Sequence, residues 1–236
     1  MQSKTVGIVG GMGPEATVDL MTKIIRATPA QKEQEHIRIL VDNNPHIPCR
    51  IEAIMRNGES PGPIMAEMAA NLEKWGADFI VIACNTAHYY LPNVIDAVKI
   101  PVLNMVEETV KELKQDGIKN VVLLATLAVL QTKLYEKALE HSGINLILPS
   151  ETYQEKVLKI IAAVKAGNFA QTTGYVDEIL EYCAEKGAEA IILGCTELPM
   201  AFYKTCESNI AIYDPTTIIA QAIVNKAFTC TEPKKI

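Results

Sequence analysis

The stretches GADFIVIAC (residues 76–84) and GAEAIILGC (residues 187–195) decide the fold of this chain. Both begin with Gly-Ala, continue as an apolar run and end in cysteine. A second pair, KTVGIVGGMGPEAT (4–17) and KNVVLLATLAVLQT (119–132), also aligns. Short apolar runs bounded by glycine indicate buried β-strands. Because the same types of run recur in the same order, we expect an internal duplication that produces two similar halves.

Strand-like runs alternate with helix-like segments along the whole chain. The expected strands cover residues 5–10, 37–42, 78–83, 101–105, 120–125, 144–149, 189–194 and 210–214. Their nearly continuous Val, Ile and Leu content is typical of parallel strands that are buried on both faces. Helices are expected after Pro14 and over 63–76, 104–117, 130–143 and 172–187, several of which end in glycine.

This alternation predicts an α/β fold. We expect two flavodoxin-like halves, each a four-stranded parallel sheet flanked by helices, related by a pseudo-two-fold axis. The first α/β domain is expected to comprise residues 1–101 together with a C-terminal helix within 215–236. The second is expected to comprise residues 102–214.

The composition favours a cytoplasmic protein with small-molecule partners. The chain has 236 residues, of which 49% are hydrophobic, and a formal net charge of −6. It contains no cluster of Lys and Arg and no apolar run of roughly 18 residues, so nucleic acid and membrane are not expected partners. The N-terminal stretch reads as a first strand, not as a signal peptide. The six cysteines form no CxxC pair and no zinc-binding spacing.

Polar residues collect where the predicted strands end. Ligands of open α/β sheets bind at the carboxyl ends of the strands. The residues at these ends are Gly10–Gly13, which include Met12; Asp42–Asn44, which include Asn43; Cys84, Asn85 and Thr86; Thr126; and Cys195, Thr196 and Glu197. If the two halves face each other, Cys84 and Cys195 lie on opposite walls of one cleft.

Two thiols on opposite sides of a ligand suit two kinds of chemistry. One is a redox disulfide, and the other is a stereochemical inversion in which one thiolate removes a proton and the opposite thiol delivers one. Each cysteine precedes an expected helix start, where backbone N–H groups bind anions and lower a thiol pKa. The hydroxyl groups of Thr86 and Thr196 would bind the same anion.

The motifs GGMGPEAT, QEH…NNPHIPCR, GADFIVIACNTAH, IPVLNMVEET, VKAGN and GAEAIILGCTELP, in this order, resemble the cofactor-independent aspartate/glutamate racemases, and among them the aspartate racemases most. The resemblance spans essentially the whole chain. It implies a two-domain homodimer that needs neither pyridoxal phosphate nor a metal and acts on a small acidic amino acid. It also implies that Cys84 and Cys195 are the catalytic acid and base.

The resemblance also implies roles for the substrate-binding residues. Asn85, Thr86 and Thr196 would bind the α-carboxylate and amino groups, while Arg50 and Lys165 would recognise the distal carboxylate. Glu197 stands where glutamate racemases carry histidine, which favours the aspartate branch. Met12, Asn43, Thr126 and Glu197 complete the expected substrate-binding set. In LLATLAVL, Ala128 and Val129 replace the family's usual glycine and second threonine, which leaves substrate preference open.

Other interpretations remain open at this point. The substrate range could extend to glutamate or other amino acids, or the fold could serve an isomerase or decarboxylase that uses one thiol. A non-catalytic or redox-responsive dicarboxylate binder is a third interpretation. GGMGPEA also contains the loose dinucleotide-binding pattern G-x-G-x-x-A, with Asp42 after the second strand, but Glu15 and the late position of Asp42 oppose it.

Several single residues have a structural interpretation beside a functional one. His88, four residues after Cys84, would either polarise the site or serve as a hydrogen-bonded structural histidine. Cys49, Cys183, Cys206 and Cys230 lack the duplicated context and are expected to be structural or incidental.

Overall fold

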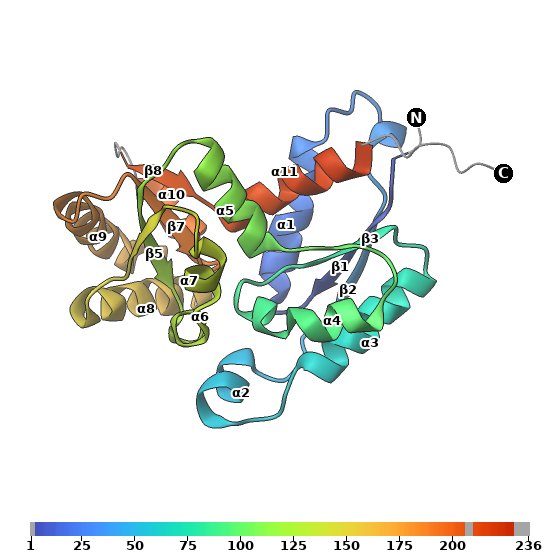
Figure 1. Cartoon of the computed structure of the whole chain (residues 1–236), viewed down its shortest axis with the longest axis horizontal. Helices are drawn as coiled ribbons and strands as arrows, with labels where there is room; N and C mark the ends of the chain where they lie inside the picture. The colour runs from blue at the N-terminus through green and yellow to red at the C-terminus, as the bar shows by residue number, and fades with distance from the viewer. Residues whose placement is uncertain (1–2, 206–209, 229–236) are drawn as a thin grey trace.

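The computed structural model describes residues 3–205 and 210–228 and contains two parallel sheets side by side (Figure 1). The first sheet has four strands in the order β2-β1-β3-β4. Its strands are β1 (Val6–Gly10), β2 (Ile39–Asn43), β3 (Phe79–Ile82) and β4 (Val102–Leu103). All of its pairings are parallel, as the apolar runs predicted.

The second sheet repeats the first. Its order is β6-β5-β7-β8, again all parallel. Its strands are β5 (Asn120–Ala125), β6 (Asn145–Ile147), β7 (Ala190–Gly194) and β8 (Ala211–Tyr213). In each half the first strand pairs with the second and the third, and the third leads to the cysteine of the duplicated motif. The predicted fold class, two four-stranded parallel α/β units, is therefore confirmed.

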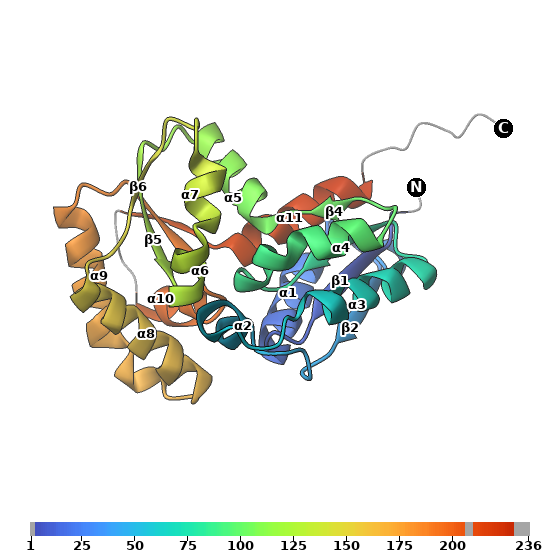
Figure 2. The ribbon, with the colours of Figure 1, turned by 60° about the horizontal axis from the view of Figure 1, so that its bottom comes forward.

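Helices flank both sheets (Figure 2). They are α1 (Pro14–Ala27), α2 (Arg50–Arg56), α3 (Gly62–Lys74), α4 (Leu91–Ala97), α5 (Met105–Gln115), α6 (Leu127–Thr132), α7 (Leu134–Leu139), α8 (Glu151–Lys165), α9 (Thr173–Glu185), α10 (Leu198–Thr205) and α11 (Pro215–Phe228). Short 3₁₀ turns cover Glu33–Glu35, Thr86–Tyr90 and Phe169–Gln171. No helix of the described residues is both long and apolar enough to cross a membrane.

Two of the expected elements differ clearly from the structure, and helix α8 was not among the expected helices. The helix expected over 130–143 is broken into α6 and α7, because Lys133 adopts a left-handed backbone with φ of 54°. The strand expected over 101–105 shortens to Val102–Leu103, because Asn104 caps α5 instead. The Oδ1 atom of Asn104 accepts a hydrogen bond from the backbone N–H of Val106 at 3.0 Å. Such side-chain capping satisfies backbone donors that the helix itself leaves free.

Each sheet buries both of its faces, which explains why its strands are apolar throughout. One face of the first sheet packs on α1 and α11, and the other packs on α3. Odd and even residues of one strand serve different faces, so Ile8 faces α1 and α11 while Val9 faces α3. The second sheet likewise contributes to one core with α8, α9 and α10 and to another with α5 and α7.

Helix α11 follows the second sheet but packs on the first half (Figure 1). The backbone N–H of Lys4 donates to the carbonyl of Ala227 at 3.0 Å, which ties the two ends of the described chain together. This packing supports the division into residues 1–101 plus 215–236 and 102–214, which stays a proposal. Residues 229–236 lie outside the described residues, as do Cys206 and Cys230.

Candidate functional site

Residues that follow β1, β3, β5 and β7 lie close together between the two halves. The hydroxyl oxygens of Thr86 and Thr126, one from each half, lie 3.4 Å apart. The Tyr135 hydroxyl of the second half donates to the Oδ1 atom of Asn85 at 2.7 Å. These contacts bring together residues that sequence analysis assigned to one site.

A cleft of 320 Å³ opens beside these contacts. Of the expected site residues, Met12, Arg50, Lys165, Thr196 and Glu197 line it. Asn43 is exposed at the end of β2 and is not among its lining residues. The other expected site residues that do not line this cleft are Cys84, Asn85, Thr86, Thr126 and Cys195. Both halves contribute lining residues, so a small molecule in the cleft would contact both.

Cys84 lies at the end of the apolar run of β3 and is only 7% exposed. Burial raises the pKa of its thiol above the ordinary value, while the adjacent Arg50 guanidinium and the backbone N–H of Ala87 act to lower it. A nearby cation favours the thiolate because it offsets the cost of a buried negative charge. The Nε atom of Arg50 is buried and has no hydrogen-bond partner among the described residues.

Cys195 follows β7, is equally buried, and has different neighbours. Its thiol donates to the Oε2 atom of Glu197 at 2.9 Å. Burial raises the pKa of Cys195 well above its ordinary value, and the negative charge and hydrogen bond of Glu197 raise it further. Lys165 lowers it, and the Nζ atom of Lys165 lies 3.6 Å from the Oε1 atom of Glu197.

Asn85 is a buried polar residue between the two halves, 2% exposed. Its Oδ1 atom accepts from Tyr135, whereas its Nδ2 atom has no partner among the described residues. A buried amide N–H group without a partner costs free energy unless it meets an acceptor. This amide is therefore available to an anionic ligand. Tyr135 was missed by sequence analysis, because it lay within a predicted helix and only its contact with Asn85 reveals its place.

His88 is a structural histidine. Its Nδ1 atom lies 2.8 Å from the carbonyl oxygen of Cys84, and its Nε2 atom accepts from the backbone N–H of Met105 at 3.1 Å. These partners require the neutral ring with the proton on Nδ1. Burial lowers the pKa of His88 to about 4. The ring thus fixes the turn after Cys84 against the start of α5.

The glycine-rich loop after β1 forms a tight turn into α1, with Pro14 as the first helical residue. Gly11 has φ of +91°, and a Cβ there would lie 2.1 Å from the carbonyl oxygen of Asn44. Only glycine fits such a position. The hydroxyl of Thr17 accepts from the Gly11 N–H at 2.9 Å, which fixes the loop and places Met12 at the cleft. The motif thus serves as the turn from β1 into α1.

Two of the altered residues after β5 lie away from solvent, whereas Leu127 before them is exposed. Ala128 and Val129 are fully buried, and Val129 packs in the core with β5. The Thr126 hydroxyl caps α6 by accepting from the Val129 N–H at 3.4 Å. Thr126 thus has a structural contact as well as its place opposite Thr86.

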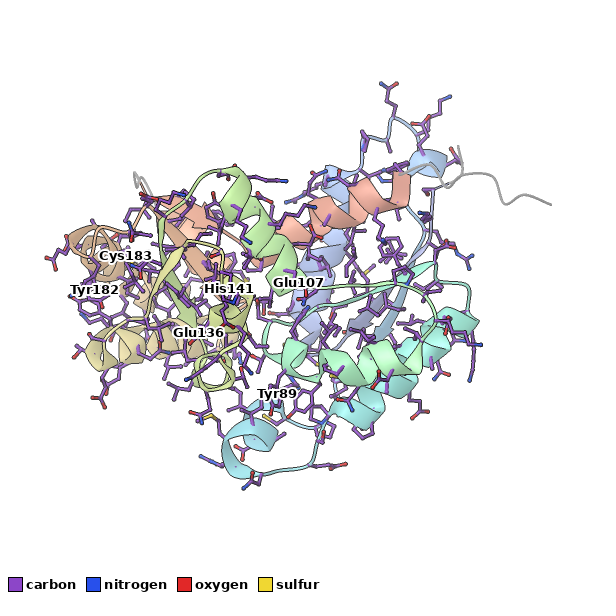
Figure 3. The ribbon with its side chains drawn as sticks, in the orientation of Figure 1. Tyr89, Glu107, Glu136, His141, Tyr182 and Cys183 are labelled. Carbon is purple, nitrogen blue, oxygen red and sulfur yellow. The ribbon has the colours of Figure 1, made fainter. Side chains whose placement is uncertain are left out.

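The remaining described cysteines lie elsewhere. Cys49 is exposed at the start of α2. Cys183 lies in α9 next to Tyr182, on the outer side of the second half (Figure 3). Burial raises the pKa of Cys183 to about 12. The described residues contain no group of three or more His, Cys, Asp or Glu side chains placed to hold a metal ion.

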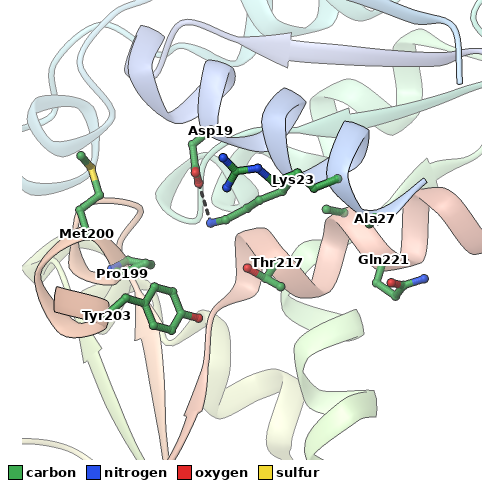
Figure 4. A pocket seen from close by; sticks show the side chains of 10 residues that line it. Asp19, Lys23, Ala27, Pro199, Met200, Tyr203, Thr217 and Gln221 are labelled. Atoms are coloured by element: carbon green, nitrogen blue, oxygen red, sulfur yellow. Dashed lines mark hydrogen bonds and ion pairs between the residues drawn. The ribbon is translucent and has the colours of Figure 1, made fainter. Parts of the chain in front are cut away.

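A second cavity, of 580 Å³, lies between α1, α10 and α11 (Figure 4). Along its wall the ammonium group of Lys23 bridges Asp19 at 2.6 Å and the buried Asp214 at 2.7 Å. Asp214 also accepts from the backbone N–H of Thr216 at 2.9 Å, at the start of α11. Lys23 thereby fixes α1 to the point where the chain returns from the second half.

Comparison with known proteins identifies the family. The sequence model of Asp/Glu/hydantoin racemases matches residues 9–223. The chain belongs to the Asp/Glu/hydantoin racemase family. A curated relative, the broad specificity amino-acid racemase RacX of Bacillus subtilis, is 31% identical over 224 residues, which cover 93% of this chain and 96% of RacX.

Solved structures of the family share the whole fold. The aspartate racemase of Picrophilus torridus is 36% identical with a TM-score of 0.85, covering 95% of this chain and 94% of that one. An aspartate racemase homologue from Pyrococcus horikoshii is 27% identical with a TM-score of 0.79, covering 95% and 99%. The glutamate racemase of Francisella tularensis, at 19% identity and a TM-score of 0.68, covers 98% of this chain and 86% of that one and shows the fold alone.

Proposed function

We propose that this racemase-family protein interconverts L- and D-aspartate without a cofactor, using Cys84 and Cys195 as the two acid–base groups. The observation that supports this most directly is the position of the thiols. They occupy equivalent places in the two duplicated halves, both are buried, and their immediate neighbours Arg50 and Glu197 line one cleft.

The reaction follows from two opposed thiols. One thiolate removes the proton from Cα, and its S–H bond forms as the C–H bond breaks. The opposite thiol then donates its proton to the other face of the carbanion and becomes a thiolate. The proton count of the protein is unchanged, and the two cysteines have exchanged protonation states. Positioned acid–base groups of this kind contribute roughly 10²–10⁴-fold to a rate.

The α-carboxylate needs donors that strengthen as charge develops on it. The free Nδ2 group of Asn85 is one donor, and Tyr135 fixes its orientation through the 2.7 Å hydrogen bond to Oδ1. The hydroxyl groups of Thr86 and Thr196 are others. Preorganised donors aimed at a developing oxyanion are usually the largest contribution to catalysis, because they need no reorganisation during the reaction.

The distal carboxylate of aspartate has two candidate partners in the cleft. Arg50 contributes a guanidinium group, which suits bidentate binding of a carboxylate. Lys165 contributes an ammonium group from the other half. Met12 and Thr126 would complete the site, and Asn43 belongs to it only if the β2 loop moves towards the cleft.

A broader substrate range is the second candidate. Lys165 already contacts Glu197, and Glu15 and Asp19 also line the cleft, so its charge is mixed. Mixed charge weakens discrimination against neutral side chains. The name of the 31% identical relative, a broad specificity amino-acid racemase, agrees with this alternative.

The deciding experiment uses purified protein without added cofactor, with L-aspartate or L-glutamate in D₂O. Optical rotation and deuterium at Cα are followed together. Loss of rotation with deuterium incorporation for aspartate supports the proposal. Incorporation without loss of rotation would mean that only one face of Cα is served. Racemisation of neutral amino acids at a comparable rate would establish the broader substrate range. No change in optical rotation or deuterium content with any amino acid would refute the racemase activity.

Two further tests address the alternatives and the assembly. Thiol titration before and after mild oxidation would reveal a redox disulfide if two thiols are lost together. We expect a homodimer, as the resemblance implies, and a cytoplasmic location, as the composition indicates. Light scattering in solution would measure the mass of the assembly, and cell fractionation would establish its location.

A further inference from the structure

Glu197 directs both of its carboxylate oxygens towards groups of its own half. Oε2 accepts from the Cys195 thiol at 2.9 Å and from the Thr196 hydroxyl at 3.2 Å, while Oε1 lies 3.6 Å from the Lys165 ammonium. The side chain is 19% exposed and lines the cleft. Glu197 therefore connects a buried sulfur with the cleft and its solvent.

The first half has no counterpart of this carboxylate. In the aligned motifs, Thr86 stands where the second half has Glu197, and its hydroxyl faces Thr126. The charged group beside Cys84 is the Arg50 guanidinium, with Glu197 acting from farther away. A cation stabilises a thiolate, and a hydrogen-bond acceptor with negative charge stabilises the protonated thiol. Burial raises the pKa of both thiols, but the main charged neighbour favours the thiolate at Cys84 and the protonated thiol at Cys195.

We propose that Glu197 is an acid–base partner of Cys195, holding it as the protonated thiol in the resting protein and returning a proton to it after turnover. Cys84 is then the resting base. This assignment rests on the proposed racemase function and deepens it. It also gives Glu197 a role different from binding substrate.

In this proton relay, which runs from solvent through Glu197 to Cys195, every proton is accounted for. After Cys195 has donated its proton to Cα, its thiolate lies next to the Glu197 carboxylate, and the two negative charges repel. Glu197 takes a proton from solvent through the cleft and passes it to sulfur, so that its O–H bond breaks as the S–H bond forms. Cys84 loses its acquired proton to solvent. The carboxylate and the resting pair of thiolate and thiol are both restored.

The first test needs no substrate. The rate of alkylation by iodoacetamide is measured against pH for each cysteine, by mass spectrometry of the peptides. In the wild-type protein, Cys84 should react at lower pH than Cys195. Glu197→Gln removes the charge and should raise the alkylation rate of Cys195 near neutral pH by about tenfold. The matched control, Glu107→Gln on the exposed face of α5, should leave both profiles unchanged.

The second test uses racemisation. Because the equilibrium constant between enantiomers is one, kcat/KM must be equal in both directions in every variant. A slower relay lowers kcat, since it delays regeneration of the resting protein, and affects kcat/KM less. We expect about a tenfold loss of kcat in Glu197→Gln, partly restored by formate or another small acid. The wild-type protein should not respond to formate.

The outcomes separate this inference from the proposed function. An unchanged alkylation profile of Cys195 in Glu197→Gln, or Cys195 reacting at lower pH than Cys84 in the wild type, would overturn the role of Glu197. Equal losses of kcat and kcat/KM without rescue by formate would overturn the relay. A wild-type protein that racemises nothing would refute the function, while the alkylation order would still test the resting protonation states.

Discussion

The two halves of this protein share a strand order and the position of a cysteine, but the side chains next to that cysteine differ. Cys84 lies beside Arg50, and its turn is fixed by His88. Cys195 donates to Glu197, and its helix begins at Leu198 without a histidine. The shared strand order thus places the two thiols equivalently, while the charged group next to each thiol differs.

That difference suits a reaction that needs one proton acceptor and one donor at a time. Two identical sites would share the proton equally, whereas unequal neighbours favour one of the two arrangements of thiolate and thiol. The predictions below test whether the two halves have unequal roles, in order of decreasing effect.

The largest effect is expected from removing either thiol. Cys84→Ser and Cys195→Ser should each lower racemisation by about 10³-fold, because a hydroxyl is a far weaker acid than a thiol. Cys49→Ser, which changes an exposed cysteine, is the matched control and should retain the wild-type rate. Substantial activity in either single active-site variant would contradict the two-base mechanism. Deuterium exchange at Cα would show whether one face is still served.

Arg50→Gln should come next, with a loss on the order of 10²-fold, since a charged hydrogen bond to substrate and the cation beside Cys84 are both lost. Arg50 lowers the pKa of Cys84, so its removal raises that pKa. The acidic limb of the pH–rate profile should therefore move to higher pH. Arg50→Lys should keep the limb nearer its wild-type position. If the acidic limb of the pH–rate profile does not move in Arg50→Gln, Arg50 does not set the pKa of Cys84.

Lys165→Gln should have a smaller effect, about tenfold, because Lys165 is half exposed and shares its charge with Glu197. We expect the KM for aspartate to rise, with little change in the KM for an amino acid that lacks a distal carboxylate. The comparison of the two substrates is the internal control. An equal loss for both would show that Lys165 acts on Cys195 or Glu197 instead of on the substrate.

Substitution of His88 should have the smallest effect on the racemisation rate at neutral pH and a measurable effect on the free energy of unfolding in acid. Its folded-state pKa of about 4 lies below the ordinary value, so the unfolded chain binds the proton more readily. The contribution of the neutral His88 ring to the free energy of unfolding is complete above about pH 6.5. It is lost as the pH falls towards 4, and the loss amounts to at most about 3 kcal/mol. Urea unfolding at several pH values would measure it. His88→Asn should flatten the pH dependence, and equal slopes would contradict this account.

Much of the fold was predictable, because its signals are local. Continuous apolar runs and terminal glycines mark buried parallel strands, and the repeated Gly-Ala…Cys pattern shows the duplication. The rule that ligands bind at strand ends selected the candidate site residues, whose roles stay predictions. The break at Lys133 was not predictable, since Lys is a good helix former and its left-handed backbone leaves no mark in the sequence.

Contacts between the halves were also beyond sequence reasoning. Tyr135 meets Asn85 across fifty positions of the chain, and Lys23 meets Asp214 across nearly the whole length. Neither pair has a periodic or motif signal, because each depends on how two separately folded sheets are placed. The contact of Glu197 with the Cys195 sulfur lies within one half, but no pattern in the sequence shows where its carboxylate points.

The return of α11 to the first half has a mechanical consequence. The polypeptide crosses between the halves twice, at the start of α5 and at the start of α11, and the two crossings lie side by side because Met105 shares a core with Ile219 and Ile223. Two adjacent crossings define a hinge line between the halves. We therefore expect any opening of the cleft to occur as a rotation about that line.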